Sequence, residues 1–552
     1  MEEPLRTETP RSGGRSATRV DAAERIAESY ADYLSDESRY GPPSADLLVF
    51  AHDEEQVSRV LGQAAESGEP VTVSGARTGI VGGAVPMGGI LLSLAEMNRV
   101  IGVRRSGDRV SLVAEPGVSI AEIEELLERG SVALEAERFA PGAAAEIDAL
   151  AGEEPGYFYP PDPTEDTAHL GATVATNASG ARSFRYGATR RHVVALRVCL
   201  PTGEILSVER GRHRVRDGRF GIEFGDGSTR TVEVPDYPMP PTKSAAGYFV
   251  RPDMDVVDLF VGSEGTLGVI TEIEVALTPR PEGILSALAF FGSDADAVAF
   301  VRHARGDFDD DPPPEAVAPI ALEFFDSMSL DFLRARKVAE GAASAIPELP
   351  EYARAGVLFE QEYTEESLLD IYEGWEAILS GHGSSMERTW GGMEEADLEK
   401  LKALRHGIAE QVNNVIARAA ADHPGIHKIG TDIAVPQPAL EEMFAFYRDS
   451  LSGTGLAYVA FGHIGDSHVH LNIMPSDLDQ LRRAEALALT FAERAVSLGG
   501  TVSAEHGIGK LKHAFLQVMF GEDGLRKMAA LKKAFDPRGI LNRGVMLPEG
   551  LL

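Results

Sequence analysis

One stretch, residues 160–191, constrains the fold of this chain more than any other. It reads PPDPTEDTAHLGATVATNASGARSFRYGATRR, a mixture of small residues, prolines and paired arginines that neither an ordinary helix nor a strand requires. Glycine permits tight turns and close approach of the backbone, and short polar side chains sit well beside exposed N–H donors. The stretch supplies both kinds: Gly171, Thr173, Asn177, Ser179, Gly180 and Gly187. It therefore predicts a loop that wraps a flat, polar, phosphate-bearing ligand.

Apolar segments at Leu47–Phe50 and Val71–Ser74 are expected strands, and with a helix between them that Asp53 caps they make a compact β–α–β unit. Ser119 and Glu122 form a capping box before an expected helix, Ile120–Arg129.

A second glycine-rich loop, Gly75–Pro86, follows the expected strand Val71–Ser74. Its sequence, GARTGIVGGAVP, lets several consecutive N–H groups converge on an anion. It matches neither the Walker pattern nor a strict GxGxxG, so those templates do not apply. A flexible surface turn is the simpler alternative. A third turn of this kind, Gly262–Gly268, precedes the expected strand Val269–Leu277.

Length and charge limit the kinds of protein that this chain can be. Its 552 residues are too many for one hydrophobic core, and we expect two large domains. The 52 Lys and Arg residues against 86 Asp and Glu give a net charge of −34, which argues against nucleic acid or an anionic membrane as the main partner. A strongly solvated acidic surface explains this charge, and adaptation to high salt is the alternative.

A single cysteine, Cys199, rules out a disulfide or a cysteine-ligated iron–sulfur cluster within the chain. The sequence has no N-terminal apolar core like that of a signal peptide, and no run of about 18 apolar residues that would span a bilayer. We expect a cytoplasmic protein, and peripheral attachment to a membrane through a partner is left open.

The chain divides into three parts. Residues 1–40 form a tail and a short helix, and about the first 20 lack periodic apolar positions and are expected to fray. Residues 41–281 form a first domain, in which the acidic, Ala- and Gly-rich segment 130–157 indicates an insertion or mobile loop. Prolines at 279 and 281 end its pattern, and residues 282–552 alternate strands with helices in an α+β arrangement.

Ionisable side chains concentrate near the C-terminus, in FGHIGDSHVHLN at 461–472 and VSAEHGIGKLK at 502–512. His463 and His470 flank a Gly-Asp turn, and Glu505 offers a hard oxygen ligand. Two imidazoles and a carboxylate suit zinc, manganese or iron(II) with open positions for a substrate. Hydrogen-bonded core histidines are the alternative.

Two further histidines belong to the same cluster. His468 lies two positions before His470, so both side chains would share one face of the expected strand. His506 is the better candidate for a general base, because an imidazole titrates near neutrality while its neighbour holds the metal. Its alternative role is to cap the turn before Gly507.

Together these motifs resemble the FAD-dependent oxidoreductases of the vanillyl-alcohol oxidase / p-cresol methylhydroxylase fold. The resemblance rests on GGAVP, the 160–191 stretch, GSEGTLGVIT, GHIGD…HLN and AEHGIGK, and covers residues 40 to 548. Within this fold the chain is most similar to the D-2-hydroxyacid dehydrogenases that act on D-lactate, glycolate or D-2-hydroxyglutarate. The resemblance implies an α+β protein with a PCMH-type, two-subdomain FAD-binding domain at 41–281 and an FAD-linked oxidase C-terminal domain, with the substrate and metal site, at 282–552.

The resemblance also implies which residues bind FAD. Some relatives attach the flavin through His or Cys, but Gly75–Gly83 contains neither, so we expect non-covalent FAD. The expected cofactor-binding residues are Ser74, Gly75, Ala76, Arg77, Thr78, Gly79, Gly82, Gly83, Pro161, Asp162, Thr164, Gly171, Thr173, Asn177, Gly180, Arg185, Tyr186, Gly187, Glu264, Gly265, Val269, Ile270 and Asn542.

In the hydroxyglutarate enzymes the corresponding histidines and glutamate bind a metal, which implies that His463, His470 and Glu505 hold a divalent ion here. With the ion as a Lewis acid, His506 would take the proton of the substrate's C2 hydroxyl while the C2 hydride moves to flavin N5, leaving a 2-oxo acid. A cation must also hold the substrate carboxylate. Arg405 and Lys428 are the candidates, and surface charges are their alternative role.

The chain departs from the commonest family pattern at one place. Ser467-His468 stands where Gly-Asn usually lies between the metal histidines, so the ligand set or the substrate pocket differs. The acceptor that reoxidises the flavin is open among a quinone, an electron-transfer flavoprotein, a separate iron–sulfur subunit and oxygen, and a homodimer is also left open. Two other functions compete: a transferase resembling alkylglycerone-phosphate synthase, and a flavin-binding subunit with a structural metal cluster that docks a partner.

Overall fold

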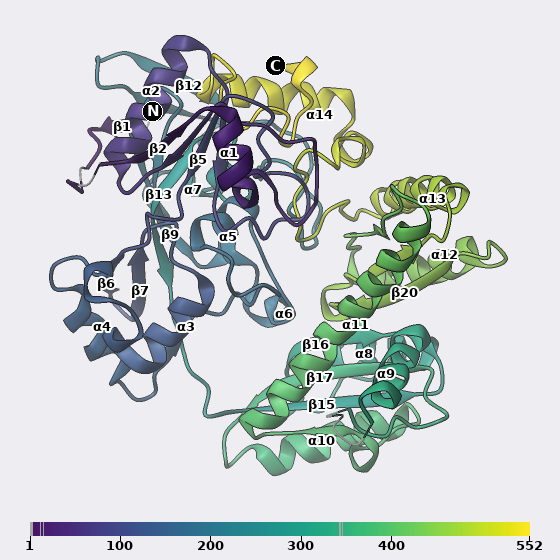
Figure 1. Cartoon of the computed structure of the whole chain (residues 1–552). Coiled ribbons are helices and arrows are strands. Elements are labelled where there is room, and N and C mark those ends of the chain that lie inside the picture. Colours follow the sequence, from purple (N-terminus) through teal and green to yellow (C-terminus); the bar gives the residue numbers. More distant parts are fainter. Residues whose placement is uncertain (1–3, 12, 15, 342–343, 345) are drawn as a thin grey trace.

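The computed structural model describes residues 4–552 except 12, 15, 342, 343 and 345. Figure 1 shows an N-terminal half, purple to blue, and a second half, teal to green, with the yellow C-terminal segment lying on the first half. Within the described residues, the first half contains an eight-stranded and a four-stranded sheet, and the second half a seven-stranded sheet. The predicted α+β class is confirmed.

The four-stranded sheet carries the first glycine loop. Its strands, in order across the sheet, are β2 (Thr18–Asp21), β3 (Leu47–Phe50), β5 (Ile90–Ser93) and β4 (Val71–Ser74). β3 and β4 both pair in parallel with β5. α2 (Glu54–Ser67) connects β3 to β4, and its first turn is capped by Asp53, whose side chain accepts a hydrogen bond from the backbone N–H of Gln56. The predicted β–α–β unit and its capping residue are confirmed.

The eight-stranded sheet forms the larger layer of the first half. Its strands, in order, are β12 (Thr229–Glu233), β11 (Arg219–Glu223), β1 (Leu5–Glu8), β10 (Ile205–Glu209), β9 (Val193–Cys199), β13 (Val269–Ala276), β7 (Arg109–Ala114) and β6 (Val100–Ser106). β1 is an inner strand, in which Thr7 pairs with Leu206 and Leu5 with Ile222. The expectation that residues 1–20 fray is therefore wrong for β1 and β2, because their backbone groups are paired in sheets.

The acidic segment 130–157 is packed structure. α3 (Ile120–Arg129), which precedes it, starts with the predicted capping box of Ser119 and Glu122. The segment itself forms α4 (Ala143–Ala151), whose Ile147 and Leu150 lie in the same hydrophobic core as α3. The expectation of a mobile loop here is wrong, since these apolar side chains are buried.

The seven-stranded sheet organises the second half. Its strands, in order, are β18 (Trp390–Gly392), β15 (Gly283–Phe291), β17 (Ala355–Tyr363), β16 (Pro319–Phe325), β20 (Ala457–Gly462), β21 (His470–Met474) and β19 (Ile429–Gly430). Alternate residues of the central strands face two cores. α8 (Asp294–Arg305) and α10 (Leu368–Gly381) fill one core, and α9 (Ser327–Glu340) and α11 (Glu395–Asp422) fill the other. α12 (Leu440–Leu451) and α13 (Leu478–Ser497) complete this half.

The C-terminal segment returns to the first half. α14 (His513–Phe535) packs against β12, and Phe535 meets Phe260 edge to face with ring centroids 5.5 Å apart. Beyond the helix, Oδ1 of Asn542 accepts a hydrogen bond from the backbone N–H of Val73 in β4 at 2.8 Å. The second domain drawn from the sequence as 282–552 thus contains a terminal segment that is part of the core of the first.

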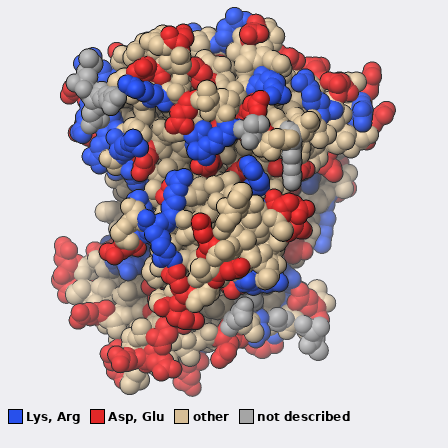
Figure 2. Space-filling view, turned by 90° about the vertical axis from the view of Figure 1, so that its left-hand side faces the viewer, with Lys and Arg blue, Asp and Glu red and all other residues tan. Residues whose placement is uncertain are grey.

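The surface is strongly charged. On the face shown in Figure 2, Asp and Glu side chains gather toward the lower end, whereas Lys and Arg side chains are interspersed over the upper part. Acidic side chains are therefore unevenly distributed over this face.

Candidate functional site

The 160–191 stretch lies where the two halves meet. Its short helix α6 (Ser183–Tyr186) packs against β16 of the second half. Nε of Arg182 donates to Oε2 of Glu360 in β17 at 2.8 Å, and the hydroxyl of Tyr186 donates to Glu362 on the same strand. Two residues expected at the cofactor, Thr164 and Tyr186, thus contact the second half, because Oγ1 of Thr164 accepts a hydrogen bond from Nη2 of Arg405 at 3.4 Å.

Close packing explains two glycines of this stretch. A Cβ at Gly180 would lie 1.9 Å from the carbonyl oxygen of Asp162, and a Cβ at Gly171 would lie 2.4 Å from Cβ of Pro116. Asn177 ends α5 (Leu170–Thr176) in the left-handed conformation, with φ of 52°. Burial raises the pKa of Asp162 to about 6. The stretch is therefore tightly packed, as its glycines predicted, but α5 and α6 make part of it helical, so the expectation of a loop throughout is wrong.

Asn542 joins the first and third glycine-rich segments. Besides accepting from β4, its side-chain amide donates to the carbonyl oxygen of Glu264 at 2.9 Å. A Cβ at Gly265 would lie 2.7 Å from this amide nitrogen. The Glu264 carboxylate accepts hydrogen bonds from the backbone N–H groups of Ile508 and Gly509 at 2.8 and 2.7 Å. The side chains of Asn542 and Glu264 thus hold β4, the third glycine-rich turn and residues 508–509 together through protein contacts.

The first glycine loop is fixed from behind by the C-terminal segment. Nζ of Lys510 donates to the carbonyl oxygens of Gly82 and Val85 at 3.1 and 2.8 Å, and burial lowers the pKa of this lysine to about 8. Arg77 adopts φ of 65° and lies over the ring of Tyr33.

The other expected FAD residues lie on the same three segments: Ser74, Gly75, Ala76, Thr78, Gly79 and Gly83; Pro161, Thr173, Arg185 and Gly187; Val269 and Ile270 at the start of β13. Among these, Gly79 and Arg185 are exposed.

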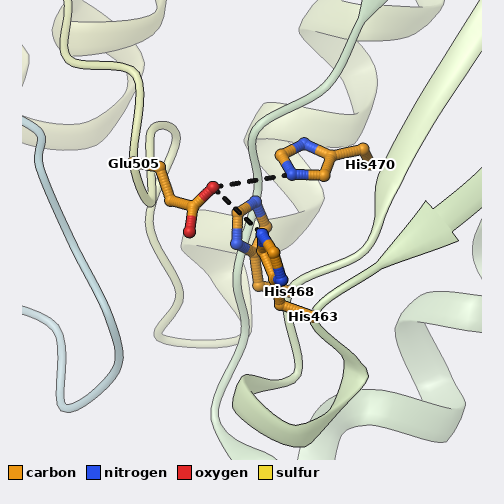
Figure 3. Close-up of side chains that lie close together, drawn as sticks. All are labelled: His463, His468, His470 and Glu505. Carbon is orange, nitrogen blue, oxygen red and sulfur yellow. Dashed lines mark ion pairs between the residues drawn. The ribbon is translucent and has the colours of Figure 1, made fainter. Parts of the chain in front are cut away.

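The histidine cluster lies at the turn between β20 and β21 (Figure 3). Nε2 of His463 and Nε2 of His470 lie 3.2 and 3.6 Å from the same oxygen, Oε2 of Glu505. Gly462 permits this convergence, because its φ is 118° and a Cβ there would lie 2.8 Å from the His470 ring. The three residues expected to hold a metal are thus brought together.

Two protein groups orient the histidine rings. Nδ1 of His463 lies 2.6 Å from Oε1 of Glu323, a nearly fully buried carboxylate on β16, and Nδ1 of His470 lies 3.3 Å from the carbonyl oxygen of Thr431. Burial disfavours the protonated ring of His463, but the carboxylates of Glu323 and Glu505 favour it more strongly and raise its pKa to about 9. Both Nε2 atoms therefore remain directed at Glu505, as in histidines that bind metals.

A second buried carboxylate, Asp432, lies against two histidines of the cluster. Its Oδ1 is 3.2 Å from Nε2 of His468, and its Oδ2 is 3.4 Å from Nδ1 of His506 and accepts a hydrogen bond from Nζ of Lys512 at 2.9 Å. The ring of His506 stacks on that of His470 with centroids 5.3 Å apart. Burial lowers the pKa of His506 to about 4, so its ring is neutral near neutral pH but is a weaker base than the near-neutral imidazole that the sequence led us to expect.

The donor set fits a divalent ion. In a tetrahedral zinc site with ligand bonds of about 2.0–2.2 Å, neighbouring donor atoms are about 3.3–3.6 Å apart, which matches the separations of the His463 and His470 nitrogens from Glu505. His468 is fully buried, and one of its nitrogens lies within 4.8 Å of the donor atoms of the other three residues. Its ring centroid is 4.4 Å from that of His470. The cluster therefore offers three or four protein ligands.

The two candidate carboxylate-binding cations lie in different surroundings. Nη1 of Arg405, on α11, is 3.8 Å from Oε2 of Glu323 and so lies beside the histidine cluster. Lys428 is exposed, and its Nζ donates to Oδ1 of Asn413 on α11 at 3.1 Å. The geometry favours Arg405.

Four residues of the site were not identified from the sequence: Ser179, Lys243, Glu323 and Asp432. Glu323 carried a signal, since it is the only charged residue in the strand PIALEFF. Lys243 carried another, since it is the only lysine in residues 1–281. Ser179 was noted only as a short polar group of the loop, and nothing in the sequence marked Asp432 as a partner of two histidines.

Within the described part of the chain, no helix is long and apolar enough to cross a membrane.

Comparisons with known proteins agree with this arrangement. Residues 45–145 and 145–209 match an FAD binding domain, and residues 280–546 match the C-terminal domain of FAD linked oxidases. The chain is 29% identical to a D-lactate dehydrogenase of Anaerostipes hadrus over 95% of this chain and 94% of that one. It is 28% identical to glycolate oxidase subunit GlcD of Bacillus subtilis over 91% and 89%, and 26% identical to D-2-hydroxyglutarate dehydrogenase of Stutzerimonas stutzeri over 94% of each.

A solved structure of alkyldihydroxyacetonephosphate synthase shares the fold, with a TM-score of 0.53 at 16% identity over 91% of this chain and 76% of that one. The chain therefore belongs to the FAD-linked oxidoreductases in which an FAD binding domain precedes the C-terminal domain of FAD linked oxidases.

Proposed function

We propose that this protein oxidises a D-2-hydroxy acid to the 2-oxo acid, with hydride transfer to a non-covalently bound FAD. One observation carries the proposal: Nε2 of His463, Nε2 of His470 and Oε2 of Glu505 converge beside the flavin-binding stretch, with His506 stacked on one of these histidines. Three relatives named for D-lactate, glycolate and D-2-hydroxyglutarate support the substrate class.

Each residue of the site has a role that follows from its charge and position. Arg405 would bind the substrate carboxylate, because its guanidinium offers paired donors at the edge of the cluster. The neutral ring of His506 would take the proton of the C2 hydroxyl, and Asp432 holds that ring in place. A divalent ion held by His463, His470 and Glu505 would supply Lewis-acid polarisation of the hydroxyl and carboxylate oxygens. FAD bound by the glycine-rich segments would accept the C2 hydride.

The electrons must leave the flavin through an external acceptor. The chain has one cysteine, Cys199, which is fully buried in the first half. The chain therefore cannot ligate an iron–sulfur cluster through cysteines of its own. We propose a quinone, an electron-transfer flavoprotein, a separate iron–sulfur subunit or oxygen as the acceptor.

Anaerobic titration of the holoenzyme tests the proposal. D-lactate, glycolate and D-2-hydroxyglutarate are added in turn, with L-lactate and L-2-hydroxyglutarate as controls of the opposite hand. We expect one D-acid or glycolate to bleach the visible absorbance of the oxidised flavin stoichiometrically, because hydride transfer reduces the cofactor. Mixing the reduced enzyme with oxygen or a soluble quinone then identifies the acceptor.

Failure of every acid to bleach the flavin would contradict a dehydrogenase. It would favour a flavin transferase of the kind with which the chain shares its fold, or a flavin-binding subunit that docks a partner.

A further inference from the structure

Lys243 is unusual both in the sequence and in its surroundings. The first 281 residues contain 27 arginines and this one lysine, in the sequence PPTKSAAGY. Its side chain is 7% exposed and lies between the two halves of the molecule. A lysine at a buried position, in a half that otherwise uses arginine, points to a role that a compact ammonium group fulfils.

The contacts of Lys243 centre on one oxygen of a metal ligand. Its Nζ donates a hydrogen bond to Oε1 of Glu505, lies 3.4 Å from the carbonyl oxygen of Gly180 and 3.5 Å from Oδ2 of Asp466. Nζ of Lys243 is therefore surrounded by three oxygens, two of which belong to carboxylates.

The two oxygens of Glu505 have different partners. Oε1 accepts hydrogen bonds from Nζ of Lys243 and, at 3.0 Å, from Oγ of Ser179, both of which belong to the flavin-binding half. Oε2 faces Nε2 of His463 and Nε2 of His470. One oxygen of the Glu505 carboxylate is therefore hydrogen-bonded to the first half, and the other faces the histidine cluster.

We infer that Lys243 is a positioning residue that restricts Glu505 to one-oxygen coordination and weakens ion binding, so that coordination positions stay open for the substrate. This inference rests on the proposed function, because it assumes a divalent ion at the histidine cluster. Catalytic metal sites keep an open position, and a carboxylate that binds through both oxygens would occupy it. The nearby ammonium charge also opposes a divalent cation.

A purely structural ion pair makes the opposite prediction. If Lys243 only kept Glu505 in place, its removal would leave a loose, unpaired carboxylate and a weaker metal site. If it restrains the site, its removal frees Oε1 for the ion and removes a repulsive charge, and both effects tighten binding.

Metal affinity of the full-length, FAD-loaded protein, stripped of metal with a chelator, tests the inference. Zn²⁺ and Mn²⁺ are titrated in competition with a chromogenic chelator. We expect Lys243→Met and Lys243→Gln to bind both ions about 10-fold tighter or more, since a unit charge has been removed near the site. Lys243→Arg keeps the charge and should stay within about threefold of wild type, as should Ser179→Ala, which removes only the neutral partner of the same oxygen.

Lys400→Met is the matched control, because it removes the same formal charge at an exposed position. The flavin spectrum and melting temperature verify that each variant is folded. X-ray absorption of zinc-loaded Lys243→Met should show one more oxygen neighbour than wild type, and its KM for the hydroxy acid should rise.

Equal or weaker ion binding by folded Lys243→Met and Lys243→Gln overturns the inference while leaving the metal site standing. Failure of the wild-type protein to bind either ion overturns the metal site and the inference together, so the two failures are distinguishable.

Discussion

Oε1 of Glu323 lies 2.6 Å from Nδ1 of His463, and strand pairing brings these two residues together. β16 pairs with β20 so that Phe324 is opposite Gly462, which makes Glu323 and His463 neighbours across the sheet. A carboxylate on a buried strand thus fixes the ring of a histidine on the adjacent turn. The centre of the seven-stranded sheet is therefore part of the site and not only its support.

Replacing Glu323 should weaken metal binding without removing a ligand. In Glu323→Gln we expect affinity for Zn²⁺ to fall about 10- to 100-fold, because the partner that orients a metal-binding histidine is lost. Chelator competition measures the affinity, and Glu441→Gln, which changes a carboxylate paired with Arg302 on the surface, is the control. Unchanged affinity with an intact flavin spectrum would show that His463 needs no such partner.

Arg405 and Lys428 should differ in their effect on substrate binding. Arg405→Met removes the cation beside the cluster, and loss of a charge-assisted hydrogen bond worth about 1.5–3 kcal/mol should raise KM about 10- to 100-fold. Lys428→Met should have a smaller effect, since its Nζ bonds Asn413 and the side chain is exposed. Steady-state kinetics with the acid that bleaches the flavin measures KM for both variants. A larger rise in KM for Lys428→Met would reverse the assignment.

Asp432→Asn should slow flavin reduction more than it weakens substrate binding. The carboxylate lies 3.4 Å from Nδ1 of His506 and 3.2 Å from Nε2 of His468, so its loss disturbs the orientation of the base. We expect the rate of flavin reduction in stopped flow to fall about 100-fold or more, within the range contributed by a positioned general base. A matched fall in FAD content would instead indicate that the variant has lost its fold.

Local patterns in the sequence predicted much of the fold. The capping residues Asp53 and Ser119 and the strands Leu47–Phe50 and Val71–Ser74 follow from short-range rules, and each occurs as predicted. The fraying expected at the N-terminus failed because Leu5–Glu8 is stabilised by strands more than 190 residues away. No local pattern reports such pairing.

The site shows the same limit. The histidines and Glu505 lie in two short motifs, so their convergence could be predicted from residue types and resemblance. Glu323, Asp432 and Lys243 are dispersed along the chain and reach the cluster only through tertiary packing. A buried charge in an apolar strand marks such a residue but does not identify its partner.

His192 should make the protein sensitive to acid. It is 7% exposed at the end of the 160–191 stretch, with Nε2 3.0 Å from the carbonyl oxygen of Tyr186, and burial lowers its pKa to about 4. The unfolded chain, with a histidine pKa of about 6.5, binds the proton more readily, so stability is full above pH 6.5 and is lost as pH falls toward 4. Between pH 7.5 and 5 this one residue should cost about 2 kcal/mol of the free energy of unfolding.

His192→Gln tests this, because glutamine retains a hydrogen-bond donor but cannot take the proton. Melting temperatures at pH 7.5 and pH 5 should fall less on acidification for this variant than for wild type. His427→Gln, at an exposed histidine, should behave like wild type. Equal losses in wild type and His192→Gln would mean that other groups set the acid sensitivity, since the buried neutral imidazole would then contribute nothing to it.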